Sequence, residues 1–295
     1  SRNFCIFFLI FCVKNLIFLL INNIILTIML KFMIKGGIMN NKDVFELTNP
    51  QRNIWNTELF FSDTNINNIC VSSIIDEVVD FNLLKKAINT LVELNESFRI
   101  KLCIENTIPM QYISDFMPFD IDIIELESMD KFKALEQSTV EEKFSLFDCN
   151  LFKFKLIKFS DGKGGIILNI HHIISDSWSL GLTIKEILKI YHCLKSGNDY
   201  ISDTFPYSNL INSEKVYKSS NRYEEDKKFW NTYLENLSEP VTIPSINKKV
   251  NLTSSLAKRT SFIMEKDMVK KISDFCVQKK ISNYSFFMSI FALYI

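Results

Sequence analysis

Two of the three histidines in the chain are adjacent, and an aspartate follows them four residues later. The stretch reads NIHHIISDSWS and contains His171, His172 and Asp176. An imidazole titrates near neutral pH, so a histidine here could take a proton from an amine or hydroxyl nucleophile. The same doublet could also bind a metal ion or lie in the core as two structural residues.

The doublet is predicted at the end of a strand. The preceding residues, GIILNIHH, are apolar up to the histidines, which is typical of a central strand, and a loop and a helix should follow. The loop after such a strand is a common place for reactive groups. Adjacent strand residues point to opposite faces, so His171 and His172 do not easily share one metal ion. The third histidine, His192, is predicted on the following helix.

Because the two side chains point in opposite directions, one imidazole could face a cleft while the other packs into the core. From spacing alone, a doublet is more often structural. Asp176 stands just before the helix and could cap it, or could form a buried ion pair that holds the loop. The sequence contains no G-x-S-x-G elbow, so a covalent acyl-enzyme is not indicated, whereas direct acyl transfer with a histidine base would fit.

Charge and cysteine content limit the possible functions. The 34 basic and 34 acidic side chains cancel, which argues against nucleic-acid binding. The seven cysteines are odd in number and never form a C-x-x-C pair, which argues against a disulfide framework and a structural zinc site. A reduced compartment, the cytoplasm, is therefore expected.

The remaining pattern predicts a mixed α/β fold of the α+β type, with helices packed on a central mixed sheet. Asp80 should cap a helix, and a hairpin should turn near Asn106. Gly197 should end the helix that follows the doublet. Helices are also predicted at 49–61, 130–144, 221–237 and in two stretches after 265, and strands at 68–78, 151–159 and 259–265. The last helix, 283–295, is apolar nearly all round and is expected to be buried.

Residues 1–38 form an apolar segment. Residues 4–34 could be a membrane anchor. The KGGIM stretch that ends at Met39 favours a different explanation. A purine-rich ribosome-binding sequence, a short spacer and an ATG codon would read as these residues if they were translated. Residues 1–38 would then be translated non-coding DNA upstream of the true start. We therefore expect the protein to start at Met39. We expect it to bind a membrane only if residues 4–34 are part of the natural protein.

Three ordered stretches carry a family resemblance. HHIISDSWS resembles the HHxxxDG motif of the condensation domains of nonribosomal peptide synthetases, members of the chloramphenicol acetyltransferase-like superfamily. LTNPQRNIW (47–55) resembles the opening motif of that family, and NESFRI (95–100) resembles its second motif, with Glu96 and Arg99 retained. Residues 205–234 are similar to a weaker Tyr- and Trp-containing region.

The resemblance implies two similar lobes that form a V around a tunnel. Residues 39–238 would be the N-terminal lobe, 239–257 a linker, and 258–295 the beginning of a C-terminal lobe that is truncated here. Substrates would arrive on the phosphopantetheine arms of donor and acceptor carrier protein domains, and no cofactor or metal would bind directly.

The resemblance also implies roles for individual residues. His172 would promote attack of an acceptor amine on a donor thioester, His171 would be mainly structural, and Asp176 would pair with Arg99. Ser177 replaces the usual glycine, and Trp178 would pack around the loop. The alternatives are a catalytically inactive fragment, a related acyltransferase that uses acyl-CoA, and a non-catalytic membrane-anchored protein.

Overall fold

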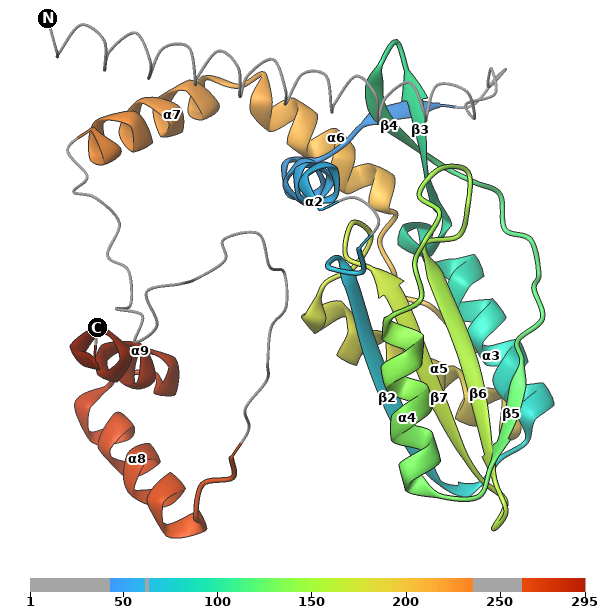
Figure 1. Ribbon diagram of the computed structural model, residues 1–295. Coiled ribbons are helices and arrows are strands. Elements are labelled where there is room, and N and C mark those ends of the chain that lie inside the picture. Colours follow the sequence, from blue (N-terminus) through green and yellow to red (C-terminus); the bar gives the residue numbers. More distant parts are fainter. Residues whose placement is uncertain (1–42, 62–63, 236–261, 295) are drawn as a thin grey trace, which may run out of the picture. The chain divides into compact units, whose positions relative to one another are not determined.

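The computed structural model describes residues 43–61, 64–235 and 262–294 (Figure 1). The chain divides into two compact units, Ser1–Ser220 and Asn221–Ile295. The apolar segment 1–38 and the predicted linker 239–257, with both of its boundaries, lie outside the described residues. Within the described ranges, none of the helices combines the length and the apolar character that crossing a membrane requires.

A four-stranded mixed sheet forms the centre of the N-terminal unit. Its order is β2-β7-β6-β5, with neighbouring strands antiparallel except for the parallel pair β5 and β6. The strands are β2 (Asn68–Val78), β5 (Ile123–Leu126), β6 (Phe152–Phe159) and β7 (Lys163–His171). The predicted mixed α/β class is confirmed. β7 has a neighbour on each side, which explains why its sequence is apolar throughout.

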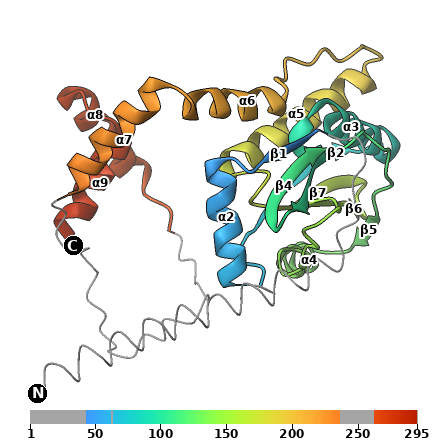
Figure 2. The same cartoon turned by 90° about the horizontal axis from the view of Figure 1, so that it is seen from above.

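Helices cover both faces of this sheet (Figures 1 and 2). The helices α3 (Phe81–Leu94) and α5 (Ser177–Lys195) lie on one face, and α4 (Met129–Val140) lies on the other. The predicted cap of α3 is confirmed, because the Asp80 carboxylate accepts hydrogen bonds from the Asn82 and Leu83 amides at 2.9 and 3.1 Å. The predicted end of α5 is also confirmed, with Gly197 at φ 69° just after it.

A second, three-stranded sheet has the order β1-β4-β3. It consists of β1 (Val44–Glu46), β3 (Ile100–Glu105) and β4 (Ile108–Ile113). The predicted hairpin is confirmed: Asn106 and Thr107 at its tip have φ of 49° and 70°. A tight two-residue turn requires such positive φ angles. The 3-10 helix η1 (Glu96–Arg99) leads into β3. The sequence analysis did not identify β1, because so short a strand shows no periodicity.

Two helices complete the N-terminal unit. In α2 (Asn49–Phe60), the Thr48 amide donates to Gln51 Oε1 at 2.9 Å, which satisfies a backbone donor at the start of the helix. Trp55, one turn further along, is buried. The helix α6 (Tyr207–Lys218) was not predicted separately; it begins after Pro206, which fixes the entry of the chain.

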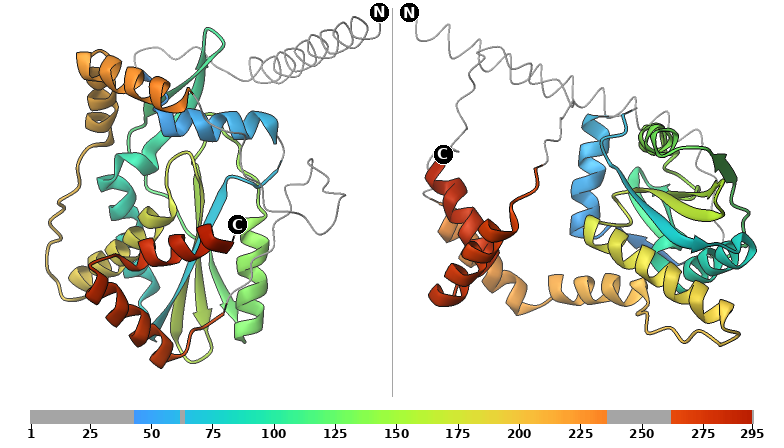
Figure 3. Two further views of the ribbon diagram at one scale, coloured as in Figure 1. Left: turned by 90° about the vertical axis from the view of Figure 1, so that its left-hand side faces the viewer. Right: turned by 90° about the horizontal axis from the view of Figure 1, so that it is seen from below.

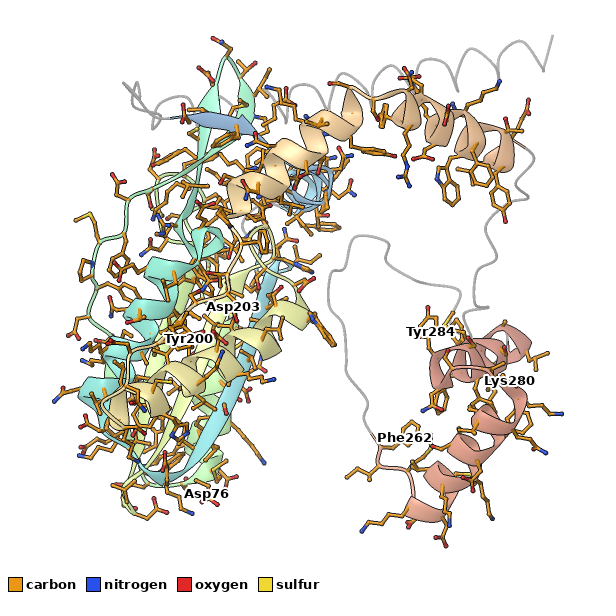
Figure 4. The ribbon with its side chains drawn as sticks, turned by 180° about the vertical axis from the view of Figure 1, so that it is seen from behind. Asp76, Tyr200, Asp203, Phe262, Lys280 and Tyr284 are labelled. Carbon is orange, nitrogen blue, oxygen red and sulfur yellow. The ribbon has the colours of Figure 1, made fainter. Side chains whose placement is uncertain are left out.

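The C-terminal unit contains α7 (Asn221–Leu234), α8 (Lys266–Lys279) and α9 (Asn283–Tyr294), and the prediction of these helices is confirmed. Lys280 adopts φ 55° and ends α8 (Figure 4). The strand prediction for 259–265 is wrong over its described part, 262–265, which has no partner strand among the described residues. The expected burial of α9 is also wrong: it has no buried residue, and Leu293 is 87% exposed.

Candidate active site

The backbone of the histidine doublet is held from two sides. β7 ends at His171, whose amide donates to the Leu151 carbonyl just before β6 at 2.8 Å. The next amide, that of His172, donates to the Asn67 carbonyl just before β2 at 2.7 Å. Both neighbours of β7 therefore contribute to the position of the doublet.

His171 faces the interior and is 3% exposed. Its Nδ1 accepts a hydrogen bond from the Ile173 amide at 3.2 Å. Because an amide can only donate, the neutral ring carries its proton on the other nitrogen, Nε2. Nε2 lies 3.5 Å from Glu58 Oε2. The Phe144 ring packs edge-on against the imidazole, with centroids 6.1 Å apart.

His172 is half-buried and has the opposite tautomer. Its Nδ1 lies 2.8 Å from the Ser175 carbonyl oxygen. Because a carbonyl can only accept, Nδ1 carries the proton. The lone pair is then on Nε2, and no described residue forms a hydrogen bond with that nitrogen. The two adjacent rings thus differ in burial and in the nitrogen that carries the proton, and only His172 has a lone pair without a partner among the described residues.

Asp176 is the N-cap of α5, the simpler of the two roles considered for it. One of its carboxylate oxygens accepts from the Ser179 amide at 2.7 Å. Hydrogen bonding from Ser179, by its side chain first and then its backbone, holds the pKa of Asp176 below its ordinary value, and His172 adds to this electrostatically. The carboxylate therefore fixes the start of α5 directly after the doublet.

The expected ion pair between Asp176 and Arg99 is not formed. Arg99 Nη1 donates to the Ser114 carbonyl at 2.8 Å, and its buried Nε has no hydrogen-bond partner in the described part of the chain. Among the ion pairs of the described residues, none joins Arg99 to Asp176. Each group instead has a backbone partner near its own element. Glu96, from the same predicted motif, accepts from Ser208 at the start of α6 at 2.9 Å.

The expected packing of Trp178 around the loop is also wrong, because its side chain is 78% exposed. The buried residues of α5 include Leu180, Ile184 and Ile187, and helical spacing places Trp178 on the opposite face. Ser177 is the first residue of α5 and is not among the described residues with positive φ. A serine therefore needs no strained backbone where relatives often have glycine.

Two further residues contact the doublet, Glu58 through its side chain and Asn67 through its backbone carbonyl, and neither was predicted from the sequence. Asn67 donates from Nδ2 to Glu58 Oε2 at 2.6 Å, next to the His171 contact described above. Glu58 stands three residues after the buried Trp55 on α2, so it is a polar residue on the inward face of a helix. That position was the available signal. Among the described residues, no group of three or more His, Cys, Asp or Glu side chains could hold a metal ion.

Sequence comparison identifies the family. Residues 41–295 match the model of the Condensation domain. The chain is 32% identical over 262 residues to surfactin synthase subunit 1 of Bacillus subtilis (strain 168), covering 85% of this chain and 7% of that protein. It is 23% identical over 261 residues to gramicidin S synthase 2 of Brevibacillus brevis, covering 85% of this chain and 6% of that protein.

Solved structures show the same fold. The starter condensation domain of the rhizomide synthetase RzmA superposes with a TM-score of 0.63 at 19% identity, covering 67% of this chain and 49% of that one. The first condensation domain of the CDA synthetase gives a TM-score of 0.60 at 18% identity, covering 70% and 53%. The family match places this fold in a family of acyltransferase-type enzymes. The chain belongs to the condensation domain family of nonribosomal peptide synthetases.

The matches cover only part of these relatives. The chain spans less than a tenth of the length of the two curated relatives, and about half of the solved condensation-domain chains.

Proposed function

We propose that His172 is the general base of an amide-forming acyl transfer. The observation that carries this proposal is the tautomer of His172: with Nδ1 bonded to the Ser175 carbonyl, the lone pair is on Nε2. That nitrogen lies on a half-buried side chain at the end of a central strand. A fixed, accessible lone pair is what proton abstraction from an amine requires.

The proposed reaction is a direct transfer. The acceptor amine attacks the carbonyl carbon of a thioester while Nε2 of His172 takes a proton from the amine nitrogen. The tetrahedral intermediate then expels the thiolate, which receives that proton from the imidazolium. One C–N bond forms and one C–S bond breaks, giving an amide and a free thiol. The Ser175 carbonyl stabilises the imidazolium through the Nδ1 hydrogen bond.

The proposed acceptor is an aminoacyl group on the phosphopantetheine arm of a carrier protein domain. The proposed donor is an acyl or aminoacyl thioester on a second carrier domain. A second candidate donor is acyl-CoA, because the similar structures include a variant of the RzmA starter condensation domain in complex with C8-CoA. Both donors present a thioester on the same pantetheine group. Thioester substrates of this kind fit the cytoplasmic location predicted from the cysteines.

A second candidate function is a domain that keeps the fold but lacks the activity. The observation that favours it is the apolar helix α9, which has no buried residue among those described. Activity of the full chain would exclude this candidate.

The experiment compares His172→Ala with the full wild-type chain. Amide formation is measured by mass spectrometry with an aminoacyl carrier protein as acceptor and either an acyl carrier protein or octanoyl-CoA as donor. Loss of a general base should lower kcat about 100- to 10,000-fold. The matched control is His192→Ala, which removes a histidine whose side chain is 57% exposed on the last turn of α5, and it should retain activity.

The outcomes are distinct. Equal turnover by wild type and His172→Ala would refute the role of His172. A wild-type chain that is inactive with both donors would favour the inactive candidate. Thermal unfolding of each variant shows whether a loss of activity comes from a loss of fold.

A further inference from the structure

We propose that Glu58 is a positioning residue that fixes His172 through the two residues that contact its carboxylate, Asn67 and His171. This inference rests on the proposed role of His172 as the base. Glu58 belongs to α2, and this helix lies close to the end of the sheet where β2 begins (Figure 3). Its side chain is 16% exposed, so little water competes with its contacts.

One carboxylate oxygen of Glu58 faces two separate parts of the chain. Oε2 accepts from Asn67 Nδ2 at 2.6 Å, in the connection that precedes β2. The same oxygen lies 3.5 Å from His171 Nε2, at the end of β7. Asn67 is 4% exposed and His171 is 3% exposed. Removing the carboxylate would leave two buried donors without this acceptor, which is costly in a site that excludes water.

Both of these contacts lead to the backbone of His172. The Asn67 carbonyl accepts from the His172 amide at 2.7 Å. Asn67 thus binds Glu58 through its side chain and His172 through its backbone. His171 directly precedes His172. Its Nε2 lies near Glu58, and its Nδ1 accepts from the Ile173 amide. The backbone of His172 is thereby connected to one carboxylate by two routes.

These contacts explain why two adjacent histidines take opposite tautomers. Glu58 is an acceptor, so it favours the proton on His171 Nε2, and His171 Nδ1 is then free to accept from Ile173. That contact shapes the turn that brings the Ser175 carbonyl to His172 Nδ1. Supporting hydrogen bonds of this kind typically change activity about 10- to 100-fold when they are removed from a metal-bound histidine, and we expect a similar size here.

The test uses Glu58→Ala, Glu58→Gln and the matched control Glu136→Ala in the full chain. Glu136 lies on α4 and accepts a hydrogen bond from Ser72 at 2.7 Å, so the control also removes a carboxylate that joins two elements. The first readout is the ¹⁵N NMR spectrum of the histidine rings. With three histidines in the chain, each ring can be assigned from a single His→Ala variant. The second readout is kcat and KM.

Glu58→Ala should mix the two tautomers of His172 and lower kcat about 10- to 100-fold, with KM within about twofold of wild type. Glu58→Gln retains an acceptor oxygen and should restore most of the wild-type spectrum and rate. Glu136→Ala should leave the His172 ring signals and kcat unchanged even where it lowers the unfolding temperature.

Wild-type ring signals for His172 in Glu58→Ala would overturn the proposal. If Glu58→Ala does not fold, Asn67→Ser is used instead. This variant removes the donor to Glu58 and keeps the backbone carbonyl that binds His172. Unchanged His172 signals in Asn67→Ser would also overturn the proposal. A wild-type chain without amide-forming activity would refute the proposed function, and the NMR readout would still decide whether Glu58 positions His172.

Discussion

In the N-terminal unit, β7 is buried along eight of its nine residues, whereas in the C-terminal unit α9 has no buried residue among its twelve. Both segments are strongly apolar in sequence. β7 is paired with β2 and β6 and covered by helices on both faces of the sheet, whereas α9 contacts α8, where the ring centroid of Phe286 lies 5.8 Å from that of Phe275. Burial therefore depends on how many neighbours an apolar segment finds, and not on its composition alone.

The two units also differ in where the partners of their side chains come from. Near the doublet, buried polar side chains such as Asn67 and His171 have partners from other elements. In α7, the exposed aromatic rings of Phe229, Trp230 and Tyr233 pack on each other, with centroids 5.4–5.9 Å apart. Tertiary contacts therefore hold the candidate active site in place, whereas the contacts described for α7 are local.

The largest expected contrast is in hydrogen exchange. Amides of β7 should exchange on the order of 1,000-fold more slowly than those of α9, because opening β7 disrupts the core and opening α9 disrupts little more than the helix itself. Mass spectrometry of deuterium uptake measures this, with α5 as a helical control from the N-terminal unit. Equal protection of α9 and α5 would show that α9 is covered in solution.

Replacing one leucine in each unit by alanine should also have very different effects on the free energy of unfolding. Leu168 in β7 is fully buried. Its replacement in Leu168→Ala should lower the free energy of unfolding by about 3–5 kcal/mol. Leu293→Ala in α9 should change it by less than about 0.5 kcal/mol. Denaturant titration of both variants measures the difference, and similar losses would contradict the contrast between the units.

The next effect concerns an ion pair of the N-terminal unit. Burial raises the pKa of Glu142, but hydrogen bonds from Lys155 and Lys153 outweigh it and hold the pKa below its ordinary value. The side chain of Lys155 is 19% exposed and pairs with Glu142. Loss of this partner in Glu142→Ala should lower the free energy of unfolding by about 1–2 kcal/mol.

The matched variant for this ion pair is Glu127→Ala. It breaks a solvent-exposed pair with Lys131. Water and salt screen such a pair, so its loss should lower the free energy of unfolding much less than the loss of Glu142 does. Equal losses for the two variants in a denaturant titration would contradict the prediction.

The smallest expected effect is at the cap of α5, where Asp176 accepts from the Ser179 amide. Asp176→Ala should lower stability by about 1 kcal/mol, and Asp176→Asn should preserve most of it, because asparagine also caps helices. The pKa of Asp176 is lowered on folding. Its charge therefore stabilises the protein above the unfolded pKa of about 3.9 and ceases to do so as the pH falls through the folded pKa.

Thermal unfolding between neutral and acidic pH tests this last prediction. Wild type should lose its advantage over Asp176→Asn toward the acidic end, since only the aspartate can be protonated there. A difference between the two that does not change with pH would contradict it.

Much of the fold could be predicted from the sequence, because the signals are local. The period of two in β6, the Asp80 cap and the Asn106 turn each depend on residues close together in the chain. The doublet was predicted at a strand end for the same reason, and the opposite environments of His171 and His172 follow from strand geometry. Short elements such as β1 were missed, since they contain too few residues to show a pattern.

Other features depended on residues distant in sequence. The partner of Arg99 is the carbonyl of Ser114 and not Asp176, and no spacing in the chain predicts that choice. The exposure of α9 likewise reflects the neighbours available to it.

The secondary structure around the doublet and the mixed α/β class could be predicted from the sequence, because periodicity and helix caps are properties of short segments, and motif resemblance singled out His172 as the proposed base. The position of the proton on each imidazole depends on contacts that form only in the folded protein. The Ser175 carbonyl and the Ile173 amide lie within three residues of the doublet, whereas Glu58, 3.5 Å from His171 Nε2, meets it only because folding brings α2 to the end of β7. A hydrogen-bond partner can fix a tautomer only where the two groups meet in space.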